Sequence, residues 1–387
     1  MRVLYISTGD YKYGAPKALM EMISILKKDY AVEPVVLTKM HNGVNEYCDK
    51  RGIENYSFFH RDIMSTSMYD NKCKNTLKHV IKYGIYLVGG FLHPAINRIG
   101  LDFATIDIVH ANTNRTDLGV YISKNYHIPH ILHLREMNGN ARGMKFYKKS
   151  WQEYLNRNTD VFVAITETVK KSWQEVGLQE DKIRVIYDGV DETDIETSKD
   201  FSLDKDIIKI VSVGHIEKHK GQADIVHAIC LLDKDKQSRL QIDFIGEGYE
   251  EYISYMKEEL SRNECLARVN FLGYCSDVHE RLGQYDVGIT CSREEGFGRT
   301  TVEYMMAGLL TIGSNIEANL EIIEEQKNGL IYLINEENSL ADLLDGVIDG
   351  IYDVTKLREN AYSDVRDKYT AKMNARNISE LYTTVYR

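Results

Sequence analysis

KIVSVGHIEKHKGQADIVHAICLL, residues 209–232, contains an apolar run, two glycines and a helical pattern in close succession. The run ends at Val213, Gly214 and Gly221 follow it, and apolar side chains then recur at the three- to four-residue spacing of a helix. A strand, a glycine loop and a helix are the opening unit of a doubly wound α/β domain. The stretch therefore predicts that such a domain begins here.

The same unit opens the chain. RVLYIS (Arg2–Ser7) is an apolar run, Gly9 and Gly14 follow it, and a helical pattern spans residues 17–27. Short apolar runs of the kind that form buried parallel strands predict the other strands, at 32–37, 106–109, 130–134, 161–165, 183–186, 240–245, 269–272, 287–290 and 309–312. We therefore expect two α/β domains.

The expected domains have definite bounds. Residues 1–187 form an N-terminal, acceptor-side Rossmann-like domain, and an acidic, polar linker follows at 188–206. Residues 207–366 form the second Rossmann-like domain, and 367–387 form a helix that returns to the first. We expect the two sheets to face each other across a deep cleft, because ligands bind at the carboxyl ends of parallel strands.

Composition places the chain among soluble globular proteins. Of its 387 residues, 43% are hydrophobic and 27% are charged. The longest apolar run, Ile85–Leu92, is far short of the ~18 residues that a membrane-spanning helix needs. Core packing is its simplest interpretation, and the alternative is that residues 83–92, Phe91 and Leu92 in particular, dock with the basic surplus on the cytoplasmic membrane face. The N-terminus lacks the pattern of a signal peptide, and the six cysteines include no CxxC pair. We expect a cytoplasmic protein with reduced thiols.

Charge is unevenly distributed. Residues 1–187 hold 26 Lys and Arg against 19 Asp and Glu, whereas residues 188–387 hold 22 against 39. Either solvated helix faces or attraction to an anionic membrane or a phosphate-bearing acceptor explains the basic surplus. The acidic total and the lack of a recognised motif argue against nucleic acid as a partner. The basic clusters are Lys72, Lys74, Lys78, Lys82 and Arg142, Lys145, Lys148, Lys149.

The segment CSREEGFGRTTVEYMMAG, residues 291–308, holds the densest set of candidate binding residues. A strand is expected to end near Cys291, and Gly296 and Gly298 then allow the backbone to approach a ligand closely. A helix is expected to start near Thr300, and its N-terminal N–H groups suit a phosphate.

Two glutamates of this segment are candidates for binding hydroxyl groups. Glu295 lies in the loop, and Glu303 lies eight positions further on, in the helix. A carboxylate accepts hydrogen bonds from the hydroxyls of a sugar or a ribose. Thr300 and Glu303 also have the spacing of a capping box, in which case Glu303 would only cap its own helix.

The whole segment resembles the EGFG…Glu signature of retaining glycosyltransferase family 4, which has the GT-B fold. Four further blocks resemble that family and follow one another in the family's order: AITETVKKSW with IRVIYDGVD, VSVGHIEKHKGQADIVHAI, VNFLGYCSDVHERLGQYDVGI and AGLLTIGSNIEANLEIIEEQKNGLIY. DIVHANT and HILHLRE match loosely in the N-terminal half.

The resemblance implies roles for individual residues. Glu295 would hold hydroxyls of the donor sugar, Glu303 would hold the ribose, and Lys220 would neutralise the diphosphate. Tyr274 lies where the family contacts the base. The backbone of the glycine turn would serve the sugar and the diphosphate, at Gly296, Phe297, Gly298, Arg299 and Thr300.

The N-terminal half contributes fewer candidates. His133 resembles a family histidine near the anomeric carbon of the donor, and a buried core histidine is the other interpretation. His110 is expected to pack at a strand end. Arg135 and Glu136 either pair with each other or reach the acceptor.

The chain departs from the family at two points. His215 stands where the family often has an arginine, so donor binding is weaker, pH-dependent or shared with Lys218 or His219. The loop Tyr13-Gly14-Ala15-Pro16 stands where the family often has paired glycines, although Gly14 still suits the diphosphate.

The sequence thus predicts a retaining, metal-independent hexosyltransferase that uses a UDP- or GDP-sugar. Its acceptor would be a glycan or a lipid-diphosphate-linked sugar, as in surface polysaccharide assembly, met at the inner face of the cytoplasmic membrane. No cofactor or metal is expected, because the DxD spacings at 204–206 and 233–235 lie in polar loops. A nucleotide-sugar epimerase of GT-B fold and a non-catalytic GT-B partner subunit are the alternatives.

Overall fold

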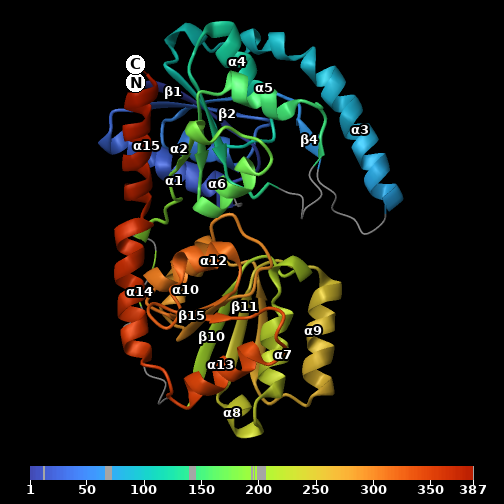
Figure 1. Ribbon diagram of the computed structural model, residues 1–387, viewed down its shortest axis with the longest axis vertical. Coiled ribbons are helices and arrows are strands. Elements are labelled where there is room, and N and C mark those ends of the chain that lie inside the picture. The colour runs from blue at the N-terminus through green and yellow to red at the C-terminus, as the bar shows by residue number, and fades with distance from the viewer. Residues whose placement is uncertain are drawn as a thin grey trace. The chain divides into compact units, whose positions relative to one another are not determined.

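The computed structural model describes residues 1–11, 14–65, 72–138, 145–192, 195, 197 and 206–386, with the backbone alone at 72–75. The chain forms two compact units (Figure 1). The first unit is Met1–Gly189 with Ala371–Arg387, and the second unit is Val190–Thr370.

The first unit is built on a parallel seven-stranded sheet with the order β3-β2-β1-β5-β6-β8-β9. These strands are β1 (Arg2–Ser7), β2 (Glu33–Thr38), β3 (Glu54–Ser57), β5 (Ile108–Ala111), β6 (His130–Leu134), β8 (Val161–Ala164) and β9 (Ile183–Val185). A short antiparallel pair lies apart from this sheet, β4 (Met64–Ser65) with β7 (Lys145–Phe146). The α-helices are α1 (Gly14–Asp29), α2 (Gly43–Lys50), α3 (Lys72–Gly90), α4 (Leu118–Tyr126), α5 (Trp151–Asn158), α6 (Glu167–Gln174) and α15 (Ala371–Val385). Three short 3₁₀ helices join them, η1 (His93–Ile99), η2 (Phe103–Thr105) and η3 (Glu180–Lys182).

The second unit is built on a parallel six-stranded sheet with the order β12-β11-β10-β13-β14-β15, which is the Rossmann order 3-2-1-4-5-6. Its strands are β10 (Ile208–Val213), β11 (Leu240–Ile245), β12 (Arg268–Gly273), β13 (Val287–Thr290), β14 (Leu310–Ser314) and β15 (Leu330–Tyr332). Its helices are η5 (Lys218–Lys220), α7 (Ala223–Leu231), α8 (Lys234–Ser238), α9 (Glu250–Arg262), α10 (Val278–Leu282), α11 (Arg299–Met306), α12 (Glu317–Ile322), α13 (Ser339–Ile348) and α14 (Val354–Lys368).

The expectation of two doubly wound α/β domains is confirmed. The expected strands are present, most of them within two residues of the predicted bounds. Four strands were missed because their signals are weak: β3 is the polar edge segment ENYS, β15 has three residues, and β4 and β7 have two each.

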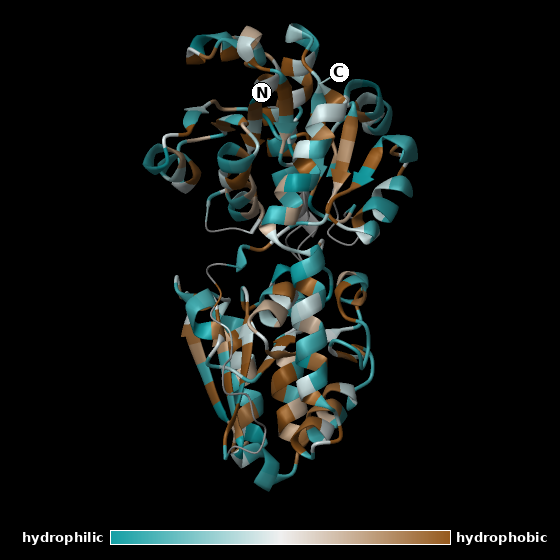
Figure 2. Ribbon diagram, turned by 90° about the vertical axis from the view of Figure 1, so that its left-hand side faces the viewer, coloured by the Kyte–Doolittle hydropathy of each residue, from teal (hydrophilic) through white to brown (hydrophobic). Residues whose placement is uncertain are grey.

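Apolar strands form the core of each unit, as Figure 2 shows by the hydrophobic colour of the sheets. Helices pack on both faces of a parallel sheet, so its strands are buried on both sides. In the second unit, α7 packs against α9 and α13, whereas α11 packs against α12 and α14.

The boundary between the units differs from the expected linker at 188–206. Asp188 is buried in the first unit, and the second unit starts at Val190. Part of the expected linker lies outside the described residues. At the other end of the second unit, α14 ends at Lys368 and α15 starts at Ala371. α15 packs against α1, and its Tyr382 is buried in the core of the first unit.

The core interpretation of Ile85–Leu92 is wrong. Ile85, Leu87, Val88, Phe91 and Leu92 are all exposed, and Phe91 is 86% exposed.

Candidate functional site

The candidate residues of the second unit gather at the carboxyl ends of β10, β12 and β13. β10 and β13 are neighbours in the sheet, although the chain leaves β10 to form β11 and β12 before it returns. Chain order therefore reverses between these two strands, and ligands of doubly wound sheets bind at such a switch point. The loop after β10 carries Lys220, and the loop after β13 carries Glu295.

Close backbone packing brings these two loops together. Gly221 has φ +68°, and a Cβ atom on it would overlap the carbonyl oxygen of Cys291 at the end of β13. Only glycine allows this approach at this φ. The backbone N–H of Arg293 also donates to the carbonyl of His219, over 3.0 Å.

Lys220 and Glu295 form an ion pair at this junction. The ammonium donates to Oε1 of Glu295, and the hydroxyl of Ser292 donates to the same oxygen over 2.6 Å. The two side chains remain 26% and 24% exposed, so solvent and ligands can reach both. One acceptor and one cation are thus held side by side, as the recognition of a sugar hydroxyl next to a phosphate requires.

The N-terminus of α11 lies shortly after Glu295 in the sequence. Gly298 is its N-cap residue, with φ +85°, and no side chain caps the helix. Phe297 is buried and packs against Tyr369, so at that position the backbone is what a ligand can contact. A helix N-terminus without a side-chain cap presents N–H groups and the positive end of the helix dipole.

The capping-box interpretation of Glu303 is therefore wrong. The helix begins at Arg299, so Thr300 is not the N-cap residue. The carboxylate of Glu303 lies 3.3 Å from Nε2 of His279 and 3.7 Å from Nε of Arg299. Glu303 is 8% exposed, and its Oε1 lies next to these two cationic or donor groups.

His279 was not among the predicted site residues. It lies in α10, the first helix after β12, and so comes from the same edge of the sheet as the other candidates. Its position six residues after the end of β12 is the signal that would have indicated it.

His215 and Tyr274 are exposed residues at this edge. His215 follows the end of β10, and its ring packs edge-on against Tyr249 with ring centroids 5.2 Å apart. Gln222 fixes its backbone by donating to the His215 carbonyl over 2.9 Å. Tyr274 follows β12 and is 63% exposed, so its ring is open to stacking.

In the first unit, His133 belongs to a buried chain of hydrogen bonds. His133 Nδ1 lies 3.1 Å from His110 Nε2, and His110 Nδ1 lies 2.7 Å from the Tyr382 hydroxyl. Tyr382 in turn donates to the hydroxyl of Tyr5 over 3.0 Å. Burial lowers the pKa of His110 to about 3 and that of His133 well below its ordinary value, and the charge of Arg135 lowers both further.

The direction of these hydrogen bonds assigns the tautomers of His110 and His133. Because Tyr382 donates to Tyr5, His110 donates from Nδ1 and accepts at Nε2 from His133 Nδ1. Nε2 of His133 is then an acceptor, and it is buried with no hydrogen-bond partner in the part of the chain that the structure describes. His133 is thus a buried core histidine, as one interpretation predicted, and it also carries an acceptor atom without a hydrogen-bond partner among the described residues.

Arg135 does not pair with Glu136. Its guanidinium donates to both oxygens of Asp188, over 2.7 and 2.6 Å, and to Asn112 over 2.6 Å. Both members of the ion pair are buried. Because Arg135 directly follows β6 and Asp188 follows β9, the pair connects the ends of these two strands. Gly14 begins α1 and is exposed, whereas Tyr13 lies outside the described residues.

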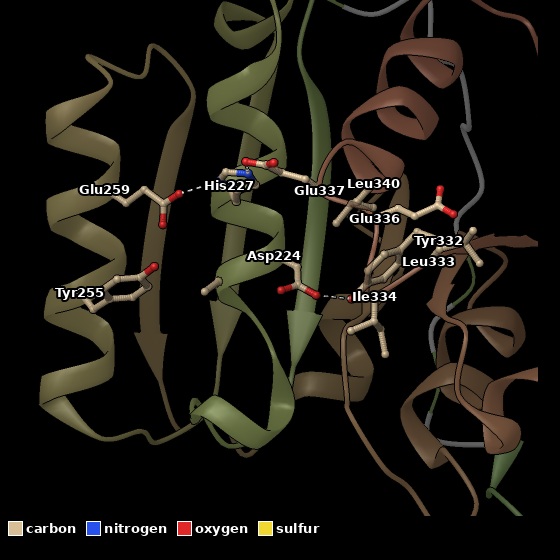
Figure 3. A pocket seen from close by; sticks show the side chains of 11 residues that line it. Asp224, His227, Tyr255, Glu259, Tyr332, Leu333, Ile334, Glu336, Glu337 and Leu340 are labelled. Atoms are coloured by element: carbon tan, nitrogen blue, oxygen red, sulfur yellow. Dashed lines mark hydrogen bonds and ion pairs between the residues drawn. The ribbon is translucent and has the colours of Figure 1, made fainter.

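A separate pocket of about 240 Å³ lies between α7, α9 and the segment after β15 (Figure 3). His227 stands in it between Glu259, at 2.9 Å, and Glu337, at 3.6 Å. Asp224 accepts from Tyr332 and forms a two-point ion pair with Arg293. None of the predicted site residues lines this pocket. Within the described residues, no group of His, Cys, Asp and Glu has the arrangement of a metal site.

The rejected DxD spacing at 233–235 is structural. Asp233 is the N-cap residue of α8, and Lys234 donates to the carbonyls of Asn263 and Glu264, each over 2.8 Å. The other spacing, at 204–206, is only partly described.

Two family models match the chain. The model described as "Glycosyl transferases group 1" matches residues 194–364, and the model described as "Glycosyltransferase Family 4" matches residues 52–194.

Curated relatives match part of the chain. "Putative glycosyltransferase EpsD" of Bacillus subtilis is 28% identical over 224 residues, which cover 52% of this chain and 57% of the relative. "O-antigen biosynthesis glycosyltransferase WclY" of Escherichia coli is 23% identical over 241 residues, which cover 60% of this chain and 61% of the relative. The chain thus spans less than two thirds of the length of either.

Solved structures match the whole chain. Anabaena Alr3699/HepE in complex with UDP has a TM-score of 0.80 at 16% identity, and the match covers 99% of this chain and 100% of that one. A glycosyltransferase from Rickettsia africae has a TM-score of 0.75 at 19% identity, covering 100% and 98%. These similarities show a shared fold.

Proposed function

We propose, from the premise that this chain belongs to a family of glycosyltransferases with the GT-B fold, that it transfers a sugar from a nucleotide-diphosphate donor to an acceptor hydroxyl. The acceptor is a glycan or a lipid-linked sugar of surface polysaccharide assembly, a proposal supported by the O-antigen relative. We place the reaction in the cytoplasm, at the inner face of the membrane. UDP is the first nucleotide to test, because the Anabaena neighbour is a complex with UDP.

One observation carries the proposal: Lys220, Glu295, Glu303 and the N-terminus of α11 meet at the switch point of a Rossmann sheet. Lys220 would hold the diphosphate together with the N–H groups of residues 298–300. Glu295 would hold the hydroxyls of the sugar, and Glu303 would hold the ribose.

These positions suit the charge that develops in the reaction. When the bond to the anomeric carbon breaks, negative charge grows on the departing diphosphate. The Lys220 ammonium and the helix N-terminus would stabilise that charge without a metal ion. Glu295 would fix the sugar in the reactive orientation.

The configuration at the anomeric carbon would be retained. The acceptor hydroxyl would attack on the face that the diphosphate leaves, and a diphosphate oxygen would receive its proton. No protein nucleophile is then required. His133 would accept a hydrogen bond from a donor-sugar hydroxyl through its unpartnered Nε2.

We propose further contacts with the donor for three other residues. Tyr274 would stack on the base, and Gly14 would approach the diphosphate. His215 would add a hydrogen-bond donor near the phosphates, in the place where the family often has a permanently charged arginine.

A turnover assay tests the proposal. The protein is incubated with UDP- and GDP-hexoses and a lipid-linked or glycan acceptor, in EDTA, and nucleotide release and the product's anomeric configuration are measured by NMR. The proposal predicts nucleotide release that depends on the acceptor, and retained configuration. An epimer formed from the nucleotide-sugar alone would replace the proposal with an epimerase.

A further inference from the structure

α3 in the first unit exposes an apolar face. Leu77, Val80, Ile81, Leu87 and Val88 lie within an arc of about 120° on this helix, at 100° per residue. With Phe91, the first residue after the helix, they form what we call the apolar face of α3. Each of the six is at least 49% exposed, and Val88 and Phe91 reach 63% and 86%.

The opposite face holds the helix to its unit through aromatic rings. The rings of His79, Tyr83 and Tyr86 pack against Tyr147, with centroids 5.2, 5.7 and 5.1 Å away. Positions 79, 83 and 86 have helical spacing, so they share one face. Figure 1 shows α3 at the margin of the unit, where its other side is turned away from the neighbouring elements.

Arg61 anchors the same face. Its guanidinium lies 4.2 Å above the Tyr86 ring and donates to the Tyr86 carbonyl over 3.1 Å. Asp117 holds that guanidinium with two hydrogen bonds. A Cβ atom on Gly89 would lie 2.8 Å from Cβ of Arg61, so a glycine allows the close contact.

α3 is therefore oriented opposite to an ordinary surface helix. Such a helix buries its apolar stripe and exposes its polar residues. On α3 the polar aromatic rings of His79, Tyr83 and Tyr86 make the contacts with Tyr147, and the aliphatic side chains are exposed. An exposed apolar surface of this kind is typical of a site that binds something apolar.

The charge around α3 specifies the kind of partner. Residues 71–101 contain no Asp or Glu, and their basic residues are Lys72, Lys74, Lys78, Lys82 and Arg98. Lys78 and Lys82 lie about 60° and 100° beyond Ile81 around the helix, on the flank between the apolar face and the face that packs on Tyr147. Partial burial and the neighbouring charges of Lys82 and Arg115 lower the pKa of Lys78, which shows that like charges gather here.

We propose that the apolar face of α3 inserts into the head-group layer of an anionic membrane, while Lys78 and Lys82 contact lipid phosphates. A basic amphipathic helix of this kind lies in the plane of the interface. Among the described residues, no helix has the length and apolarity to cross a membrane. A second copy of the chain is a poorer occupant, because a symmetric contact would place the lysines of two identical patches against each other.

Co-sedimentation with lipid vesicles tests the proposal. The full chain is mixed with phosphatidylcholine vesicles and with vesicles that also hold phosphatidylglycerol, at low and high salt. We expect binding to the anionic vesicles that weakens as salt rises, and little binding to the neutral ones.

Two variants and a control identify the surface. Leu77→Ser with Val88→Ser and Phe91→Ser should weaken binding at least about tenfold, because apolar insertion is lost. Lys78→Gln with Lys82→Gln should weaken it roughly fivefold per lysine, with loss of the preference for anionic lipid. Ile351→Ser, at an apolar position of the second unit that is 72% exposed, should bind as the wild type does.

A second measurement covers the case of a misfolded variant. In the single variant Phe91→Trp, the added fluorescence should shift to the blue with anionic vesicles. An unshifted spectrum, or equal binding by wild type and the triple serine variant, would overturn the proposal. So would a dimer in light scattering that the serine variant dissociates without any lipid binding. UDP binding is measured separately, so its failure would count against the proposed function and leave the membrane face untouched.

Discussion

Lys220 and Glu295 lie 75 residues apart in the sequence and form an ion pair at the carboxyl edge of the second sheet. The pair places a cation and a carboxylate in one partly exposed contact. In our account these charges separate in function when the donor binds, the cation serving the diphosphate and the carboxylate serving the sugar.

Substitution of the pair should separate the two functions. Lys220→Ala should weaken UDP binding by about 10- to 100-fold, because a hydrogen bond to a charged group contributes ~1.5–3 kcal/mol. Glu295→Gln should leave UDP affinity nearly unchanged and lower turnover of the UDP-sugar at least about tenfold. Calorimetric titration with UDP and a turnover assay measure the two effects.

The matched control is the exposed pair Lys327 and Glu324. Lys327→Ala should leave both UDP affinity and turnover unchanged. Equal loss of UDP affinity in Lys220→Ala and Glu295→Gln would show that the ion pair is only structural.

Glu303 should be specific for the ribose. Glu303→Ala should weaken UDP binding about tenfold, through loss of hydrogen bonds that the carboxylate accepts. The wild type should bind 2′,3′-dideoxy-UDP correspondingly weakly, whereas the variant should bind both nucleotides alike. Glu336→Ala, at an exposed position in the separate pocket, is the control. A variant that still distinguishes the two nucleotides would contradict the role.

The buried ion pair of Arg135 and Asp188 should dominate the stability of its surroundings. Asp188→Asn should lower the free energy of unfolding by about 3–5 kcal/mol, because it leaves a buried guanidinium without its counter-charge. Urea denaturation of the full chain measures this. Glu380→Gln, which breaks the exposed pair with Arg376, should cost less than about 0.5 kcal/mol. Similar effects of the two substitutions would contradict the burial that we describe.

Stability should fall as the pH drops below 6.5. Burial lowers the pKa of His110 to about 3, and that of His60 and His130 to about 4. The unfolded chain therefore binds protons between pH 6.5 and about 4 that the folded chain does not bind. Each such histidine lowers the free energy of unfolding by up to about 2 kcal/mol at pH 5.

Urea denaturation at pH 7 and pH 5 checks this dependence. His130→Asn should reduce the loss of stability between the two pH values, whereas His41→Asn, at an exposed position, should not. A free energy of unfolding that is the same at both pH values would contradict the burial of these rings.

Local patterns in the sequence predicted most of the fold. Apolar runs and glycines mark β1 and β10, because a buried parallel strand followed by a tight turn needs those residue types. The polar strand β3 has no such signal, since it lies at the edge of its sheet. Sheet order depends on contacts between distant segments, which spacing in one sequence does not encode.

The sequence indicated candidate residues for the site and not the contacts between them. The segment at 291–308 indicated Glu295 and Glu303, but the pairing of Glu303 with His279 depends on how α10 packs. Asp188 looked like part of a polar linker, because a buried ion pair has no local pattern. The run at 85–92 left core packing and membrane docking open, because an apolar run fits either. The packing of His79, Tyr83 and Tyr86 on Tyr147, which no local pattern encodes, turns that run outward.

A thermal-shift panel with UDP, GDP, ADP and CMP, with and without Mg²⁺, tests the central claim most directly. At 100 times its dissociation constant a nucleotide adds ~2.7 kcal/mol of stability. At ~2–4 °C per kcal/mol, the melting temperature should rise by several degrees. Our account predicts this rise with one nucleotide, UDP first, independent of Mg²⁺ and lost in Lys220→Ala. No rise with any of the four would contradict a donor site at Lys220, Glu295 and Glu303, and would favour a non-catalytic partner of the same fold.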